Sequence, residues 1–111
     1  MTNYSRGANF ERQVKAHLEG RGYFVIRAAG SHGIVDLLAM PTKRARFPFV
    51  MFIQCKTNGK ASPADRKLLN DAAKSVGAWP YMACRPKKGI IRYGSYRDEK
   101  VGRKQWEWVE P

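Results

Sequence analysis

Two short apolar runs, residues 33–38 and 49–56, constrain what this chain can fold into more than any other feature. Both are rich in β-branched and aromatic residues and are bounded by turn-forming or basic residues. That pattern is typical of buried β-strands. We expect the two runs to be neighbouring strands at the centre of one sheet.

Three polar residues interrupt these predicted strands. Asp36 lies inside Ile-Val-Asp-Leu-Leu, and Gln54 and Lys56 end the second run. Because side chains alternate along a strand, Gln54 and Lys56 point the same way, roughly 6.5 Å apart. If the strands pair, Asp36 meets them on that face, and a carboxylate, an amide oxygen and an ammonium group converge. An unpaired carboxylate is costly to bury, so we expect a divalent cation beside Asp36 as well as the lysine.

Two helices are predicted from periodicity and capping patterns. An apolar face formed by Phe10, Val14, His17 and Leu18 predicts a helix over residues 5–19. A second helix begins after Ser62, where Ser-Pro-Ala-Asp supplies an N-cap and a proline in the first turn. Its predicted apolar stripe comprises Leu68, Leu69, Ala72, Ala73 and Val76.

The remaining elements give a single α/β domain. Further strands are predicted at residues 23–27, 79–84 and 90–93, with an edge strand over 106–109 and a basic turn at 42–46. The order is therefore α-β-β-β-α-β plus an appendage. It predicts an antiparallel meander followed by a crossover, and so a mixed central sheet flanked by helices. We place the core at about residues 5–94 and a basic C-terminal appendage at about 95–111.

The charge of the chain predicts a polyanionic partner. Its 21 lysines and arginines against 9 aspartates and glutamates give a formal net charge of +12, which favours nucleic acid or an anionic membrane surface. No apolar run approaches the roughly 20 residues of a membrane span. The N-terminal residues lack the apolar core of a signal peptide, so we expect a cytoplasmic protein with no membrane partner. Cys55 and Cys84 are interpreted as buried free thiols, with a disulfide between neighbouring strands as the alternative.

Each polar residue also has an ordinary structural explanation. Glu11 would form an i,i+4 ion pair with Lys15 on the surface of the first helix, and Asp36 would form a buried pair with Arg27. Gln54 would be a harmless residue at a strand end, and Lys56 a side chain that extends to solvent. Chance accounts for each of these residues singly more readily than for their combination.

The combination suits phosphodiester hydrolysis. The anionic oxygens of a phosphodiester repel a nucleophile, and Mg²⁺ offsets this by binding carboxylate and phosphate oxygens. A lysine can orient or activate the attacking water. Asp36, the Gln54 side-chain oxygen and the Cys55 backbone carbonyl would form an oxygen cage, although a neutral glutamine binds a dication less tightly than a glutamate.

Four segments resemble a known family. Residues 6–12, 25–31, 35–37 and 53–56 read Arg-Gly-Ala-Asn-Phe-Glu-Arg, Val-Ile-Arg-Ala-Ala-Gly-Ser, Val-Asp-Leu and Ile-Gln-Cys-Lys. Together they resemble the archaeal-type Holliday junction resolvases, in particular the small phage-borne members, within the PD-(D/E)XK nuclease superfamily. The resemblance covers about residues 5–85 and implies a restriction-endonuclease-like core. Valine stands where the superfamily motif has proline, and Gln54 stands where glutamate is usual.

The resemblance implies an activity and a set of site residues. The expected enzyme is a Mg²⁺-dependent endonuclease, with Mn²⁺ as a substitute. It would work as a homodimer that makes paired nicks in a four-way DNA junction and leaves 5′-phosphates. Glu11, Asp36 and Gln54 would carry the metal site, and Lys56 would serve the attacking water. The residues implied to contact or orient the scissile phosphate are Arg12, Arg27 and Ser31.

Basic residues outside this site are interpreted as phosphate contacts, which position DNA without reading its sequence. The full set of predicted DNA-binding residues is Arg6, Arg12, Arg27, Ser31, His32, Lys43, Arg44, Arg46, Lys60, Arg85, Lys87 and Lys88. A solvated surface is the alternative for the basic residues, and a loop hydrogen bond for His32. Five aromatic residues would line either a dimer seam or the core: Phe47, Phe49, Trp79, Trp106 and Trp108.

Two other functions remain open from the sequence. One is a related flap, nicking or general DNA endonuclease on the same core. The other is a DNA-binding module in which Gln54 has weakened catalysis.

Overall fold

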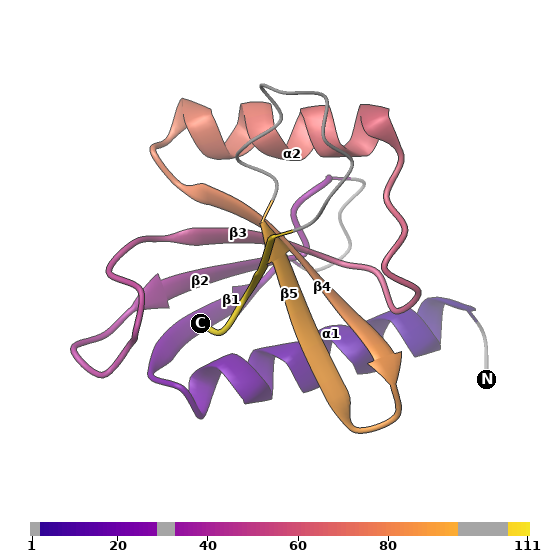
Figure 1. The fold of residues 1–111 in the computed structure, drawn as a ribbon, viewed down its shortest axis with the longest axis horizontal. Helices are drawn as coiled ribbons and strands as arrows, with labels where there is room; N and C mark the ends of the chain where they lie inside the picture. Colours follow the sequence, from indigo (N-terminus) through magenta and orange to yellow (C-terminus); the bar gives the residue numbers. More distant parts are fainter. Residues whose placement is uncertain (1–2, 29–32, 96–106) are drawn as a thin grey trace.

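The computed structural model describes residues 3–28, 33–95 and 107–111, and for Asn3–Arg6 and Glu107 the backbone alone. Within these residues the chain forms two helices and one six-stranded sheet (Figure 1). In chain order the elements are α1 (Asn3–Glu19), β1 (Tyr23–Arg27), β2 (Leu37–Pro41), β3 (Met51–Cys55), α2 (Pro63–Ser75), β4 (Trp79–Lys87), β5 (Ile90–Ser95) and β6 (Glu107–Val109).

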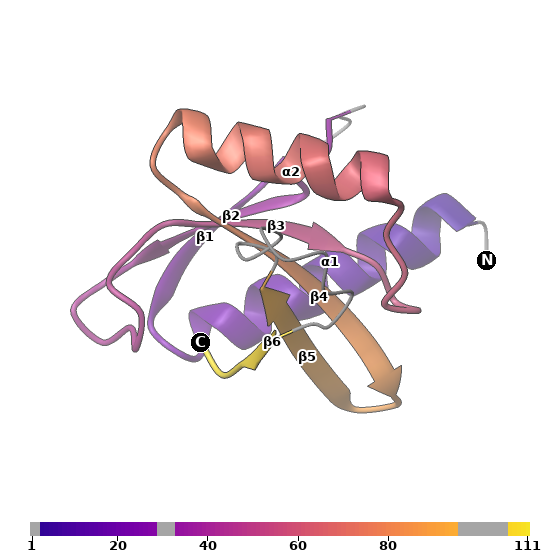
Figure 2. The ribbon, with the colours of Figure 1, turned by 45° about the horizontal axis from the view of Figure 1, so that its top comes forward.

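The sheet is mixed, as the element order predicts. Its strand order is β1-β2-β3-β4-β5-β6, and β3 and β4 form the one parallel pair among the described strands. A parallel pair needs a crossover connection, and α2 supplies it. The two helices cover opposite faces of the sheet (Figure 1), and β6 lies beside β5 near the C-terminus (Figure 2). The predicted meander, crossover and edge strand are confirmed.

The core on the α1 side follows from alternation on the strands and from helical spacing. Phe10, Val14 and Leu18 recur every four residues on α1 and are buried against Met51 and Ile53 of β3. Phe52, between those two strand residues, packs instead in a smaller cluster with Leu69 of α2. Successive strand side chains point to opposite faces, so β3 is covered on both sides.

The aromatic residues that the sequence left open divide between core and surface. Phe47, Phe49 and Trp79 pack against the main core, and the rings of Phe49 and Trp79 stack with centroids 4.7 Å apart. Trp108 is exposed, and Trp106 lies outside the described residues.

The N-cap of α2 is confirmed, but the predicted apolar stripe is too wide. The Ser62 hydroxyl accepts a hydrogen bond from the Asp65 N–H at 3.1 Å. Leu69 and Ala73 are buried, whereas Leu68 and Val76 are 56% and 66% exposed. Because α2 packs on β3 and β4 through a narrow line, the outer part of the stripe meets solvent.

Several strand boundaries differ from the sequence prediction, and two of these differences concern the polar residues. The predicted strand at residues 33–38 starts too early, because β2 begins at Leu37 and Asp36 precedes it. Lys56 lies one residue beyond the end of β3, although its N–H still donates to the Ala83 carbonyl of β4. Asp36 and Lys56 therefore lie just outside the strands, and Gln54 is the penultimate residue of β3.

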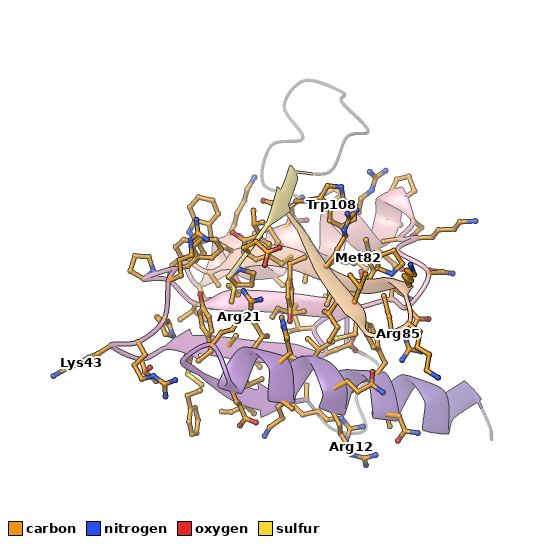
Figure 3. All side chains as sticks on the ribbon, turned by 60° about the horizontal axis from the view of Figure 1, so that its bottom comes forward. Arg12, Arg21, Lys43, Met82, Arg85 and Trp108 are labelled. Carbon is orange, nitrogen blue, oxygen red and sulfur yellow. The ribbon has the colours of Figure 1, made fainter. Side chains whose placement is uncertain are left out.

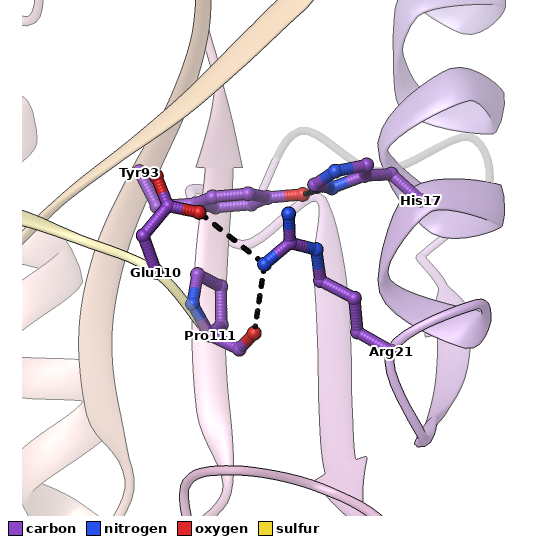
Figure 4. A network of polar contacts seen from close by, with 5 residues as sticks. All are labelled: His17, Arg21, Tyr93, Glu110 and Pro111. Carbon is purple, nitrogen blue, oxygen red and sulfur yellow. Dashed lines mark hydrogen bonds and ion pairs between the residues drawn. The ribbon is translucent and has the colours of Figure 1, made fainter.

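The C-terminal residues pack back onto α1 (Figure 4). Nη1 of Arg21 contacts the Glu110 carboxylate at 3.2 Å and the Pro111 carbonyl oxygen at 3.3 Å. The imidazole of His17 lies at the hydroxyl end of the Tyr93 ring of β5, nearly parallel to it, and its Nδ1 is 2.8 Å from the Tyr93 hydroxyl. Burial, and then the nearby Arg21, lower the pKa of His17. These contacts fix β5 and the final residues against the end of the helix.

Cys55 and Cys84 are free thiols, so the disulfide alternative is wrong. Neither of the described helices is long and apolar enough to cross a membrane.

Candidate active site

Asp36 is held at the point where β1, β2 and β3 come together. Its carbonyl oxygen accepts a hydrogen bond from the Ala28 N–H, and its own N–H donates to the Ile53 carbonyl, each at 2.9 Å. Its carboxylate Oδ2 accepts a hydrogen bond from the Cys55 N–H at 2.7 Å. Backbone groups of both neighbouring strands therefore fix the position of this side chain.

The local register gives Asp36 its direction. Leu37 is already opposite Ile53 in the β2–β3 ladder, yet the Asp36 N–H bonds to the same Ile53 carbonyl. Two successive residues therefore face one, which is the count found in a β-bulge. Bulges re-aim a side chain, and here the Asp36 carboxylate turns to the Cys55 N–H instead of continuing the regular pleat.

Burial and neighbouring charges act on Asp36 in opposite directions. Burial is the largest effect and raises the pKa of Asp36 to about 6. The Cys55 N–H lowers this pKa, the Glu11 carboxylate raises it, and the cations of Lys56 and Arg27 lower it. Glu11, Lys56 and Arg27 thus all lie close enough to act electrostatically on one partly buried carboxylate.

Glu11 and Arg27 form an ion pair between α1 and β1. Arg27 Nε donates to Glu11 Oε1 at 2.9 Å, and both side chains are mostly buried. Both ordinary explanations of the acids are therefore wrong, because Lys15 pairs with Glu19 at 3.0 Å and Arg27 pairs with Glu11 rather than with Asp36. The pair holds the Glu11 carboxylate beside the end of β1.

Gln54 is buried, and its Oε1 lacks a hydrogen-bond partner within the described residues. It lies opposite Met82 of β4 and shares the strand alternation of Phe52, which places it on the face that α2 covers. A buried amide oxygen without a partner is costly. Such an oxygen is available to a cation ligand or to water.

The donor set fits a weakly chelated Mg²⁺. Within residues 3–28, 33–95 and 107–111, no three histidine, cysteine or acidic side chains are grouped to hold a metal ion. Magnesium, however, is usually held by one or two carboxylates, waters and substrate phosphates, all of them oxygen ligands. Asp36 and Glu11 supply the carboxylates. The unpartnered Gln54 oxygen is on the adjacent strand but on the face that α2 covers, whereas Glu11 comes from α1 on the other face.

The other predicted site residues are dispersed. Arg12 is exposed and contacts Asn9 of the same helix. Arg85 of β4 donates to Gln13 at 3.1 Å and lies 5.6 Å from the centre of the Phe10 ring, next to the Glu11 turn of α1. Lys43 lies at one extremity of the molecule, well apart from Arg12 and Arg85 (Figure 3). Ser31, His32 and the Arg6 side chain lie outside the described part of the chain.

The sequence interpretation missed the role of the Cys55 N–H. It assigned the Cys55 carbonyl to a metal, whereas the structure uses the amide of the same residue to hold Asp36. No local sequence pattern predicts the register shift that allows the Cys55 N–H to bond to the Asp36 carboxylate. Burial is the largest of the effects that raise the pKa of the Cys55 thiol, so the thiol stays protonated near neutral pH.

The raised pKa of Asp36 predicts how stability depends on pH. The folded-state pKa of about 6 lies above the ordinary value of 3.8. Folding is therefore favoured by the protonated group at low pH, and this contribution is lost as pH rises through about 6. Asp36→Asn removes the titration, so the free energy of unfolding of the variant minus that of the parent should increase between pH 4 and pH 7. Urea unfolding of both proteins in EDTA measures this, and a constant difference would contradict it.

The mixed six-stranded sheet and the helices on its two faces define the restriction-endonuclease-like class of α/β domains. Among solved structures, the chain superposes on the Holliday junction resolvase Hjc of Archaeoglobus fulgidus, an archaeal hyperthermophile. The TM-score is 0.68 at 23% identity, covering 83% of this chain and 74% of the other. That likeness shows the fold.

Sequence comparison shows the family. Residues 2–101 match the family model described as archaeal Holliday junction resolvase (Hjc). The chain is also 38% identical over 84 residues to the crossover junction endodeoxyribonuclease Hjc of Methanocaldococcus jannaschii, covering 72% of this chain and 59% of the relative. This chain therefore belongs to the archaeal Holliday junction resolvase family, and it spans about three fifths of that curated relative.

Proposed function

We propose that this chain is a structure-selective DNA endonuclease that resolves four-way junctions by metal-dependent hydrolysis of paired phosphodiesters. It would act inside the cell as a homodimer and leave 5′-phosphates. The observation that carries the proposal is the family match over residues 2–101, combined with a partly buried Asp36 on which Glu11, Lys56 and Arg27 act electrostatically. The net charge of +12 supports a DNA partner.

Three charged residues of the candidate site have distinct proposed roles. Asp36, fixed by the Cys55 N–H, presents a carboxylate whose desolvation favours a nearby cation. Lys56, at the end of β3, orients the attacking water and offsets negative charge as it develops. Arg27 keeps Glu11 in place and adds positive charge near the phosphate.

Mg²⁺ would be held by Asp36 and Glu11, with the Gln54 side-chain oxygen and the Cys55 carbonyl as neutral donors, and Mn²⁺ would substitute for it. The ion would supply Lewis-acid stabilisation of the charge on the phosphate. Arg12 and Ser31 would contact the scissile phosphate, as the family resemblance implies.

Cleavage of a supercoiled plasmid that extrudes a cruciform tests the proposal against the related endonucleases. We expect paired cuts at the cruciform in Mg²⁺, no cutting in EDTA, and little cutting of a linear duplex of the same sequence. Mapping the product ends then distinguishes 5′-phosphates from other ends. Equal cutting of the linear duplex would instead indicate a flap, nicking or general nuclease.

A binding module without efficient catalysis is the second candidate, and Gln54 favours it. Gln54 brings no charge to a site in which Asp36 and Glu11 are the nearest acids. Junction binding without cleavage at any Mg²⁺ or Mn²⁺ concentration would support this candidate.

Replacing Gln54 with glutamate tests its part in metal binding. If Gln54 is a ligand, the added charge in Gln54→Glu should lower the Mg²⁺ concentration that gives half-maximal cleavage, by about tenfold for 1.4 kcal/mol of added binding energy. Cleavage rates over a Mg²⁺ titration measure the change. Ser75→Glu on the exposed surface of α2 is the matched control, and identical titrations of parent and Gln54→Glu would show that Gln54 is not a ligand.

A further inference from the structure

The loop between β2 and β3 carries a compact group of unneutralised cations. Lys43, Arg44 and Arg46 are exposed, and none has a carboxylate partner among the described residues. Four other cations are ion-paired, namely Lys15, Arg21, Arg27 and Lys67. The loop therefore presents a local positive potential that the rest of the described chain does not cancel.

The first half of this loop is clamped onto the turn between α1 and β1. The Thr42 N–H donates to the Gly22 carbonyl at 3.1 Å, and the Thr42 hydroxyl binds the same oxygen. A Cβ at Gly22 would lie 2.8 Å from the Arg44 carbonyl carbon, and Gly22 has a φ of +95°. The close approach leaves room for glycine alone, so the backbone of Arg44 rests directly on the turn.

The second half is held by aromatic packing. The Phe47 N–H donates to the buried Tyr23 hydroxyl at 3.0 Å. The Phe47 ring stacks on Phe49 with centroids 5.2 Å apart, and Phe49 stacks in turn on Trp79. A loop fixed at both ends loses little conformational entropy when it binds a ligand, so its cations are pre-organised.

The loop is also remote from Asp36. Strand β2 runs from Leu37, next to Asp36, to Pro41, next to the loop. At about 3.4 Å per residue, the five residues from Asp36 to Pro41 place the near end of the loop roughly 17 Å from Asp36 along the strand. Figure 3 shows Lys43 at one extremity, well apart from Arg12 and Arg85. Duplex DNA rises 3.4 Å per base pair on each strand, so a duplex arm lying along β2 would cover this separation in about five base pairs.

We propose that Lys43, Arg44 and Arg46 form a second, rigid phosphate-binding site for the DNA duplex, about five base pairs from the bond that is cleaved. The site holds the backbone of an arm by charge and reads no bases. It rests on the proposed function, because its distance is measured from the candidate active site. The site binds only an arm that continues as a duplex from the active site towards the loop, and this requirement contributes to selectivity for branched DNA.

The first test removes charge from the loop. Lys43→Gln/Arg44→Gln is compared with Lys67→Gln/Lys74→Gln on α2, which changes the net charge equally. Binding to a four-way junction is measured without divalent cations over 50–200 mM salt. The loop variant should lose about tenfold or more in affinity at ~0.1 M salt. The slope of log affinity against log salt should become shallower by about 1.8, for two phosphate contacts. Equal slopes for the two variants would overturn the proposal.

The second test locates the DNA partner of the loop. In one junction, phosphates four to seven base pairs from the cleavage position are replaced by uncharged methylphosphonates on both strands of each arm. In a control junction, phosphates beyond twelve base pairs are replaced instead. Methylphosphonates at four to seven base pairs should weaken binding by the parent protein. They should cause no further loss of affinity in Lys43→Gln/Arg44→Gln. Losses that simply multiply would show that the loop and these phosphates do not meet. If the parent protein shows no preference for the junction, the proposed function itself fails.

A third variant displaces the loop without changing its charge. Gly22→Ala should push Arg44 away and lower junction affinity several-fold. Gly77→Ala, at a φ of +73° with open space around it, adds similar backbone strain elsewhere and should bind like the parent. Thermal unfolding checks both variants, and normal binding by a folded Gly22→Ala would contradict the pre-organised site.

Discussion

Asp36→Asn should abolish junction cleavage while leaving junction binding within about threefold of the parent. The asparagine oxygen still accepts the Cys55 N–H, so the local geometry survives, but the charge that attracts the cation is removed. Losing a metal ligand removes several kcal/mol of transition-state stabilisation. At about 1.4 kcal/mol per factor of ten, that is a fall of about 10³-fold or more in cleavage rate.

Single-turnover cleavage of a synthetic four-way junction in Mg²⁺ measures the rate, and mobility-shift binding in EDTA measures the affinity. Asp71→Asn on the exposed face of α2 is the matched control, because it removes one carboxylate far from the site. Unchanged cleavage by Asp36→Asn would remove the active site proposed above.

Lys56→Ala should reduce cleavage by about 10²- to 10⁴-fold, the range expected when a group that orients or activates the nucleophile is removed. Its backbone contributes to the sheet through the hydrogen bond to Ala83, which alanine keeps. The variant should therefore fold and bind the junction normally. Lys56→Arg separates two roles for the lysine: it should restore most of the rate if Lys56 supplies only charge, and little if its amine acts on the water.

The same cleavage and binding measurements apply, with Lys74→Ala as a control for a lost surface lysine. A cleavage rate within threefold of the parent in Lys56→Ala would show that Lys56 is not part of the reaction.

The fold could be predicted from the sequence because the patterns that specify each helix and strand are local. The spacing of Phe10, Val14 and Leu18, the Ser62 cap and the alternation around Ile53 each specify one element and its buried face. The connections then allow few arrangements, since three strands joined by turns form a meander and α2 must cross over.

The site was less predictable because its geometry depends on long-range contacts. The alternation of side chains along the strands predicted that Asp36 and Gln54 point to one face of the sheet. The extra residue opposite Ile53 instead directs the Asp36 carboxylate to the Cys55 N–H. The partner of Glu11 was also unpredictable, since Arg27 comes from another element and competes with the nearby Lys15. Whether Gln54 binds a metal stays a prediction.

The order of the strands has a consequence for how the chain emerges from the ribosome. Glu11, Arg27, Asp36 and Lys56 all precede α2, so the parts of the candidate site are synthesised before β4 exists to pair with β3. Until then one side of β3 is an open strand edge, of the kind that promotes aggregation of partly folded chains. Nascent chains that end before Trp79 should therefore need chaperone protection, and the arrival of β4 ends that exposure.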